Sequence, residues 1–185
     1  YKIMEIRNKA LISLLIYQGL TTGELTQLTI NDINLEQGTI YIKSTTLTNR
    51  RTIGLKTKQI MILYQYIKEI YPKLLSRNKG NYPLPIANCS SPIANCPLLL
   101  TWRGTPENGE GIHYLISTYK KHFLGRNLNP RTIRQSVITN LLKQGKDVRI
   151  VQEYAGHKSP DTTERYKQSR TEELQQAINK YHPLK

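Results

Sequence analysis

Two arginines, one histidine and one tyrosine follow one another in the stretch from Asn129 to Tyr166. Arg131 and Arg134 are three residues apart, His157 completes a Gly-His pair, and Tyr166 comes nine residues after it. Guanidinium groups match the oxygens of a phosphate, and a tyrosine hydroxyl is able to attack a phosphodiester. The stretch therefore predicts a site that holds a phosphodiester for attack by Tyr166.

The two arginines are expected at the start of a helix. Asn129 suits the N-cap and Pro130 the first helical position, and the pattern runs to about Gln144. At helical spacing Arg131 and Arg134 both fall on the apolar side. A guanidinium beside a core is costly unless it meets an anion, and the helix dipole disfavours a cation there. A bound anion is one explanation; pairing with Asp or Glu, or exposure of the side-chain ends, is the alternative.

Taken alone, His157 and Tyr166 are weak signals. A lone histidine is more often a structural hydrogen-bonding residue than a catalyst, and Tyr166 is one of 12 tyrosines, most of which we expect to serve packing. Their neighbourhood is basic, because residues 119–170 contain 12 Lys and Arg against 4 Asp and Glu. This local excess favours an anionic partner near the stretch.

Composition points the same way. The 185 residues carry a formal charge of +14, which favours a polyanion as partner, with nucleic acid ahead of an anionic membrane. The beginning of the sequence does not resemble a signal peptide, and its longest apolar run, at residues 10–17, is too short to span a membrane. Two cysteines without a nearby histidine do not form a zinc site, so we expect no metal and a reduced, cytoplasmic protein.

The remaining pattern predicts an α+β fold that is mainly α-helical. A buried helix is expected over residues 3–19, apolar on most sides including Ile16, followed by a short helix capped by Thr21 or Thr22. Residues 30–35, 39–42 and 51–55 predict a small three-stranded antiparallel sheet. Further helices are expected over residues 58–70, closed by Pro72, and over 109–124, 147–154, 159–166 and 171–181. In the helix over 147–154, Val148, Ile150 and Val151 are expected to point inward.

Residues 76–98 contain a repeat of period seven with four prolines, which predicts a low-complexity loop inserted on the surface. A partner-binding loop, or a disulfide between Cys89 and Cys96, is the alternative for this insertion. The rest forms one domain over residues 1–185. The chain opens inside a helical pattern without Met, so we expect it to be a fragment from which an N-terminal partner domain, a core-binding domain, is missing.

The order of the motifs resembles the tyrosine recombinases, or phage integrases. Arg-x-x-Arg is followed by an amphipathic helix, by Gln-Glu-Tyr-Ala-Gly-His at residues 152–157 and by Thr-Thr-x-x-Tyr at 162–166. Residues 14–25, which read LLIYQGLTTGEL, look like the first box of that family, and the predicted sheet follows where the family has one. The resemblance covers nearly the whole chain except the insertion, and it implies the catalytic-domain fold of tyrosine recombinases.

The resemblance implies site-specific DNA recombination or integration without a cofactor. Tyr166 would attack a DNA phosphodiester and form a 3′-phosphotyrosine, with Arg134 clamping the phosphate and His157 orienting groups or exchanging protons. A lysine on the β-hairpin would act as general acid. Glu24 matches the first-box glutamate, which would support the phosphate-binding residues without contacting the phosphate itself. Arg131, Arg134, Lys158, Arg165, Arg50 and Arg51 are the residues expected to bind DNA phosphates.

Three positions depart from the family pattern. The first-box arginine would fall at Thr21, and the histidine of the His-x-x-Arg motif is Arg131. The hairpin lysine is either replaced by Thr46 or supplied by Lys43. Losing one preorganised donor typically costs ~10²–10³ in rate, unless Arg50, Arg51 or Arg131 replaces the missing arginine in space.

Three functions therefore stay open. The first is a tyrosine-type DNA recombinase of bacterial or mobile-element origin; the second is a catalytically impaired relative that binds DNA without cutting it. The third is a basic RNA-binding or ribosome-associated domain. The resemblance implies double-stranded DNA as partner and self-association as a tetramer on DNA, with the helix over 171–181 exchanged between protomers or packed on its own domain.

Overall fold

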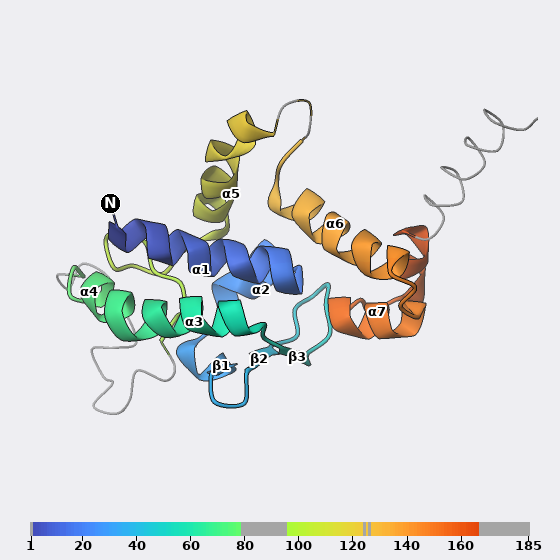
Figure 1. Cartoon of the computed structure of the whole chain (residues 1–185), viewed down its shortest axis with the longest axis horizontal. Helices are drawn as coiled ribbons and strands as arrows, with labels where there is room; N and C mark the ends of the chain where they lie inside the picture. Colours follow the sequence, from blue (N-terminus) through green and yellow to red (C-terminus); the bar gives the residue numbers. More distant parts are fainter. Residues whose placement is uncertain (1, 79–95, 124, 126, 167–185) are drawn as a thin grey trace, which may run out of the picture.

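The computed structural model describes residues 2–78, 96–123, 125 and 127–166. Figure 1 shows a long central helix with helices on several sides and a small sheet at one edge. In the described residues, no helix has both the length and the apolar character needed to cross a membrane. The architecture is α+β and mainly helical, as predicted.

The central helix is α1 (Lys2–Gln18), which ends at Gly19 with a φ of +62°. Its leucines are fully buried and pack against α3 and α6. We expected this helix to be apolar on most sides and buried all round. That expectation is wrong at Ile16. Both Ile16 and Tyr17 are exposed, because the last turn of α1 faces an open groove rather than another helix.

The short helix α2 (Thr22–Gln27) and a 3-10 turn, η1 (Ile30–Asp32), lead into the sheet. Strands β1 (Ile33–Asn34), β2 (Thr39–Ile42) and β3 (Arg51–Gly54) pair antiparallel in that order. In the β2–β3 pair Ile40 lies opposite Ile53, and both are buried, so one face of the sheet covers the core. The predicted three-stranded sheet is confirmed, although its first strand is shorter than expected.

The next helical run consists of α3 (Thr57–Gln65), a π-helical segment η2 (Tyr66–Ile70) and α4 (Tyr71–Leu75). The prediction that Pro72 closes this helix is wrong, because the chain stays helical to Leu75. Proline lacks the N–H that continues a helix, and the π segment accommodates it at the start of α4. At this junction the N–H of Tyr71 donates to the carbonyl of Tyr66, five residues back.

The return from the insertion enters the core. Cys96 and Leu98 are buried, and backbone hydrogen bonds join Ile30 to Cys96 and Leu98 to Leu28. The predicted surface loop over residues 76–98 is therefore too long at its C-terminal end, because residues 96–98 pair with the segment after α2. Cys89 and the period-seven repeat lie outside the described residues, so the disulfide alternative stays untested.

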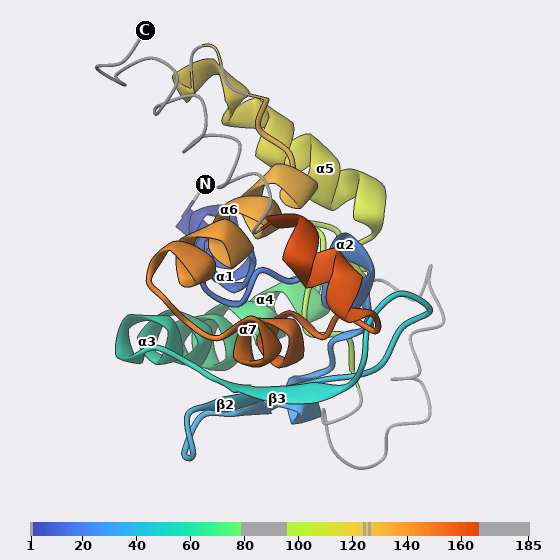
Figure 2. The ribbon, with the colours of Figure 1, turned by 90° about the vertical axis from the view of Figure 1, so that its right-hand side faces the viewer.

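The last described elements are α5 (Gly109–Thr118), the 3-10 turn η5 (Lys120–His122), α6 (Pro130–Lys143), α7 (Val148–Ala155) and a helix over residues 160–166. Figure 2 shows α7 beside β3, with α6 against α1. A second, smaller apolar cluster joins α6 to α7 through residues such as Ile138 and Val151. The inward placement predicted for Ile150 is wrong, since it is 61% exposed on the groove side of α7. The helix predicted over 171–181 lies outside the described residues.

Candidate functional site

Arg134 lies in the second turn of α6, on the side that faces α1. Asn129 caps the helix by accepting a hydrogen bond from the Thr132 N–H, and Pro130 is buried at its first position. Arg134 is 8% exposed, whereas Arg131 is exposed. The prediction that both arginines lie beside the core therefore holds for Arg134 and is wrong for Arg131. The buried row of α6 consists of Pro130, Arg134, Ile138 and Leu142, and Arg131 lies beside this row on the exposed side of the helix.

The guanidinium of Arg134 joins three segments that are far apart in sequence. Its Nη1 donates to the carbonyl of Gly19 at 2.7 Å, and its Nη2 donates to the carbonyl of Ala155 at 2.6 Å. Nη1 also lies 3.7 Å from the Glu24 carboxylate. Arg134 thus ties the end of α1, the start of α2 and the end of α7 to one point.

Glu24 is buried and belongs to the capping box of α2. The Thr21 N–H donates to Oε2 of Glu24 at 2.8 Å, while the Glu24 N–H donates to the Thr21 hydroxyl at 3.1 Å. Burial on its own would raise the pKa of Glu24, but the hydrogen bond and charge of Arg51 outweigh it, so the pKa lies below its usual value. Glu24 is therefore a carboxylate that serves both the helix cap and the arginines.

Arg51, on β3, is the second arginine at this carboxylate. Its Nη1 lies 2.5 Å from Oε1 of Glu24, and its Nε donates to the carbonyl of Tyr154 at 2.7 Å. Of the three arginines considered as substitutes for the missing first-box arginine, Arg50 and Arg131 are exposed, and Arg51 is buried in the cluster. Sequence reasoning named Arg51 as one candidate among three and had no signal for its pairing with Glu24.

The turn after α7 is held against the β-hairpin. Asp147 caps α7, and Gly156 ends it in the left-handed conformation with a φ of +70°. The N–H of Asn49, in the hairpin loop, donates to the Gly156 carbonyl at 2.8 Å, and Thr48 pairs with His157 through an isolated bridge. A β-carbon on Gly156 would collide with the Arg51 guanidinium, so glycine is required both for the φ angle and for space.

His157 is buried next to Tyr166. Its Nδ1 lies 2.7 Å from the hydroxyl oxygen of Thr163, and its ring stacks on that of Tyr166, with 6.2 Å between centroids and 12° between planes. Burial foremost, and then the charges of Arg134 and Arg51, lower the pKa of His157 to about 4. The imidazole is therefore neutral at pH 7. Thr163, which is fully buried, was not identified from the sequence, although it belongs to the Thr-Thr-x-x-Tyr motif.

The candidates for the hairpin lysine are placed differently. The Nζ of Lys43 lies 3.1 Å from the carboxylate of Asp32 in η1, and Lys43 is otherwise exposed. Thr46 is exposed in the hairpin loop. In the arrangement described here, Lys43 is thus engaged by Asp32.

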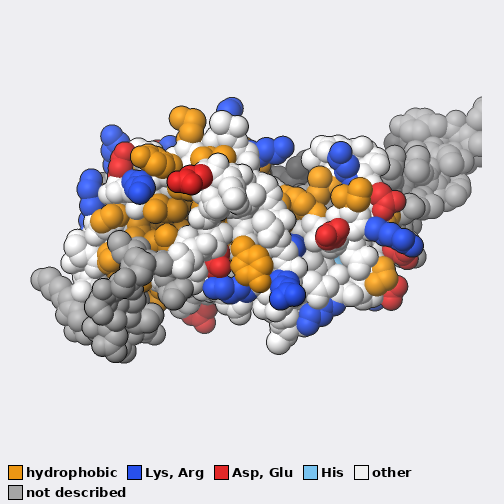
Figure 3. Space-filling model, turned by 90° about the horizontal axis from the view of Figure 1, so that it is seen from below, with side chains coloured by type: hydrophobic (Ala, Val, Ile, Leu, Met, Phe, Trp, Pro, Cys, Tyr) orange, Lys and Arg blue, Asp and Glu red, His pale blue; other side chains and the backbone are white. Residues whose placement is uncertain are grey.

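The remaining sequence-predicted phosphate ligands lie on the surface. Arg50, Lys158 and Arg165 are exposed, as are Lys43 and Arg131. Figure 3, which views the molecule from the sheet side, shows Lys and Arg side chains interspersed with hydrophobic and uncharged ones. These cations lie at the surface, and of them Lys43 is paired with Asp32.

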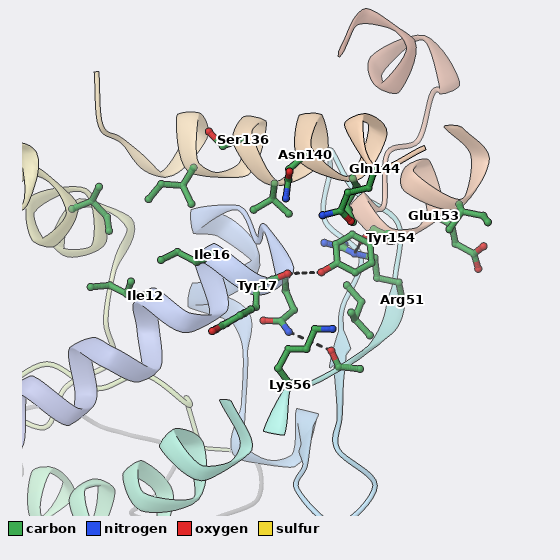
Figure 4. A pocket seen from close by; sticks show the side chains of 18 of the residues that line it. Ile12, Ile16, Tyr17, Arg51, Lys56, Ser136, Asn140, Gln144, Glu153 and Tyr154 are labelled. Carbon is green, nitrogen blue, oxygen red and sulfur yellow. Dashed lines mark hydrogen bonds between the residues drawn. The ribbon is translucent and has the colours of Figure 1, made fainter. Parts of the chain in front are cut away.

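An apolar groove of about 1270 Å³ opens beside the site. Figure 4 shows it between α1 and α6, with Tyr154 reaching across to Tyr17, whose carbonyl accepts its hydroxyl hydrogen bond at 2.5 Å. Apolar side chains of α1, of α6 and of the segment after η5 line much of it, among them Ile12, Ile16, Phe123, Ile133, Val137 and Leu141. Sequence reasoning missed Tyr154, whose carbonyl and hydroxyl connect Arg51 to the end of α1.

Within residues 2–78, 96–123 and 127–166 there is no group of three or more His, Cys, Asp and Glu side chains arranged to hold a metal ion. The assembled groups are instead two buried arginines, one carboxylate, a neutral imidazole and a tyrosine. Such a set is able to bind an anion and to present a hydroxyl to it.

Comparisons with known proteins match one protein family. The model of the phage integrase family matches residues 1–173. The chain is 31% identical to the tyrosine recombinase XerD of Staphylococcus haemolyticus over 179 residues, which cover 96% of the chain and 55% of XerD. It is also 31% identical to XerC of Pelotomaculum thermopropionicum over 180 residues, which cover 96% of the chain and 55% of XerC. The chain thus spans about half the length of these curated relatives.

Solved structures share the fold. The XerH site-specific recombinase, in a post-cleavage complex with its palindromic difH substrate, superposes with a TM-score of 0.72 at 24% identity, covering 96% of the chain and 46% of XerH. The XerA recombinase superposes with a TM-score of 0.69 at 23% identity, covering 98% of the chain and 60% of XerA. The predicted catalytic-domain fold is therefore confirmed.

Proposed function

The chain belongs to the phage integrase family, and on that premise we propose that it catalyses site-specific DNA strand exchange with Tyr166 as the nucleophile. The observation that carries the proposal is the convergence of Tyr166, His157 and Arg134. Tyr166 stacks on His157, and the charge of Arg134 helps to lower the pKa of the His157 imidazole. In this proposal the nucleophile and the phosphate-binding cation belong to one site.

In the proposed step the Tyr166 oxygen attacks the phosphorus and the bond to the 5′ oxygen breaks. The products are a 3′-phosphotyrosine and a 5′-hydroxyl, and the same bond energy serves the reverse reaction with a new strand. Arg134 stabilises the charge on the non-bridging oxygens. His157, neutral at pH 7, is available to orient the phosphate or to exchange the proton that Tyr166 loses.

Lys43 is our candidate for the general acid that protonates the departing 5′ oxygen. It follows directly after β2, where the hairpin loop begins, and it carries a positive charge at that end of the strand. In this proposal DNA binding frees Lys43 from Asp32, because a phosphodiester backbone offers the ammonium group another anionic partner. Lys43 is 44% exposed, and after it leaves, Asp32 still accepts two hydrogen bonds from Thr29.

Double-stranded DNA is the proposed partner, and self-association as a tetramer on DNA is part of the proposal. The XerH structure is a complex with a DNA substrate, which supports a DNA partner for a chain of the same family. The exposed cations Arg50, Arg131, Lys158 and Arg165 would contact backbone phosphates. Affinity for duplex DNA should then fall steeply with rising salt.

Covalent capture tests the function. The chain is incubated with a pool of nicked duplexes of randomised sequence, from which the short cleaved fragment diffuses away and traps the covalent complex. We expect a complex that survives denaturing electrophoresis with the unmodified chain and none with Tyr166→Phe. A chain that binds duplexes but yields no covalent complex from the pool would instead be a DNA-binding relative that does not cut.

A further inference from the structure

We propose that Arg51 is a second arginine ligand of the scissile phosphate and supplies the charge that Thr21, at the first-box position, lacks. The inference rests on the proposed function and deepens it, because it assigns a phosphate contact to a residue of the β-hairpin. Thr21 itself is committed elsewhere, since both its hydroxyl and its N–H belong to the capping box of α2.

The position of Arg51 supports its role as a phosphate ligand. Arg51 and Arg134 approach the same Glu24 carboxylate, at 2.5 Å and 3.7 Å, from two different elements. They are buried to nearly the same extent, 7% and 8% exposed. Both charges also act on His157, which stacks on Tyr166. Arg51 is therefore a member of the cluster that contains the nucleophile.

An unsatisfied hydrogen-bond donor of Arg51 also supports the proposal. The Nη2 of Arg51 is buried and has no hydrogen-bond partner among the residues that the structure describes. A buried donor without a partner is unfavourable, and more so when it carries a charge, so such a donor requires an explanation. A phosphate oxygen that reaches Nη2 when DNA displaces the side chains covering it would satisfy the donor.

The other nitrogens of Arg51 fix the direction of this donor in advance. Nε donates to the carbonyl of Tyr154, and Nη1 donates to Glu24 and, at 3.3 Å, to the carbonyl of Asn49. Because the guanidinium is planar, these contacts from three segments leave Nη2 little freedom to turn. A donor held in this way needs no reorganisation when charge develops on the phosphate.

The net charge of the cluster supports the proposal as well. Two arginines against one carboxylate leave the cluster with one excess positive charge, and neutral His157 adds none. A phosphodiester brings one negative charge. Without Arg51 the cluster would be neutral overall before DNA binds, and the phosphate would have no uncompensated cation to meet.

A charge-selective substrate tests the proposal. Nicked duplexes recovered by covalent capture are synthesised with either a normal scissile phosphodiester or a methylphosphonate, in which one charged oxygen is replaced by a neutral methyl group. Arg51→Met should slow covalent-complex formation ~10²–10³-fold on the phosphodiester. On the methylphosphonate it should slow the reaction at least tenfold less, because the charge that Arg51 neutralises is gone.

Arg7→Met is the matched control. Arg7 is also a buried arginine in an ion pair, with Glu107, but it lies at the far end of α1. Any loss caused by Arg7→Met should be equal on the two substrates. The proposal is overturned if Arg51→Met slows both substrates equally or slows neither. Should Arg51→Met fail to fold by thermal denaturation, Arg51→Gln, which also removes the charge but keeps an N–H donor for the neighbouring carbonyls, is held to the same criterion of unequal loss.

Failure of the proposed function would look different. If the unmodified chain forms no covalent complex, phosphate-ethylation interference on duplexes selected for binding still tests Arg51. Ethylation removes the charge of one phosphate at a time, so it maps the phosphates that the protein contacts. Arg51→Met, but not Arg7→Met, should lose one phosphate from the interference pattern of the unmodified chain, and an unchanged pattern would overturn the role of Arg51.

Discussion

Glu24 and Arg51 form an ion pair with 2.5 Å between Oε1 and Nη1, and their side chains are 0% and 4% exposed. The pair joins α2 to β3 across 27 residues of sequence. Because Arg134 also lies near this carboxylate, Glu24 holds two arginines that would otherwise repel each other in a buried place. The position of both phosphate-binding candidates thus depends on one carboxyl group.

Replacing Glu24 with glutamine should destabilise the fold strongly. Glu24→Gln keeps the shape of the side chain but leaves two buried cations without a counter-ion, and we expect a loss of about 3–5 kcal/mol. Urea denaturation at pH 7 measures it. Glu5→Gln is the matched control, because it removes the fully exposed Glu5–Lys9 pair and should cause no measurable change. Equal effects of the two substitutions would contradict the buried role of Glu24.

Two glycines with the same backbone conformation allow the cost of backbone strain to be measured separately from the cost of a steric clash. Gly145 and Gly156 have φ angles of +77° and +70°, but a β-carbon would meet open space at Gly145 and the Arg51 guanidinium at Gly156. Gly145→Ala should cost about 1–2 kcal/mol for the left-handed backbone. Gly156→Ala should cost about 1–3 kcal/mol more, by overpacking. Denaturation of both variants in parallel checks the difference, and equal losses would place Arg51 elsewhere.

His157 should make stability depend on pH. Its pKa falls from 6.5 to about 4 on folding, so the unfolded chain binds more protons between these values. Stability is therefore complete above pH 6.5 and decreases as the pH falls toward 4, by about 2 kcal/mol between pH 6.5 and 5. The lowered pKa of Glu24 acts in the same direction, but mainly below its usual value of 4.5.

Urea denaturation at pH 6.5 and 5 isolates the histidine. His157→Gln should remove most of the pH dependence in this window, whereas His113→Gln, on the exposed face of α5, should preserve it. A chain that keeps its full pH dependence after His157→Gln would show that His157 is not the buried neutral group described above.

Lys43 is tested through the leaving group. Lys43→Gln should slow covalent-complex formation by ~10²–10⁴ on an ordinary nicked duplex, the typical contribution of a general acid. A duplex with sulfur in place of the bridging 5′ oxygen should restore the rate, because a thiolate departs without a proton. Lys68→Gln, on the exposed side of η2, should react like the unmodified chain on both substrates. Equal slowing of the two substrates by Lys43→Gln would exclude it as the acid.

Local sequence signals predicted much of the fold. The three strands, the helix cap expected at Thr21 or Thr22 and found at Thr21, and the cap at Asn129 depend on residues within a few positions of one another along the chain. Errors arose where tertiary context decides. Ile16 and Ile150 fit an apolar face, yet both face the groove, because no described helix covers it.

The sequence predicted which residues form the site better than it predicted which of them contact one another. Motif order identified His157, Tyr166 and Arg134 together, and the structure brings these three side chains into one neighbourhood. Helical spacing placed Arg131 beside Arg134, but spacing does not show where the core ends. The sharing of Glu24 between Arg51 and Arg134 joins residues up to 110 positions apart, and a single sequence contains no local signal for such a pairing.

The identity of the residue linked to DNA tests the central claim most directly. Covalent complexes captured from the nicked-duplex pool are digested with nuclease and protease, and the peptide that retains a nucleotide is sequenced by mass spectrometry. The account predicts a single modified peptide, with the 3′ phosphate attached to the phenolic oxygen of Tyr166. Attachment to any other residue, or a covalent complex that persists in Tyr166→Phe, would contradict it.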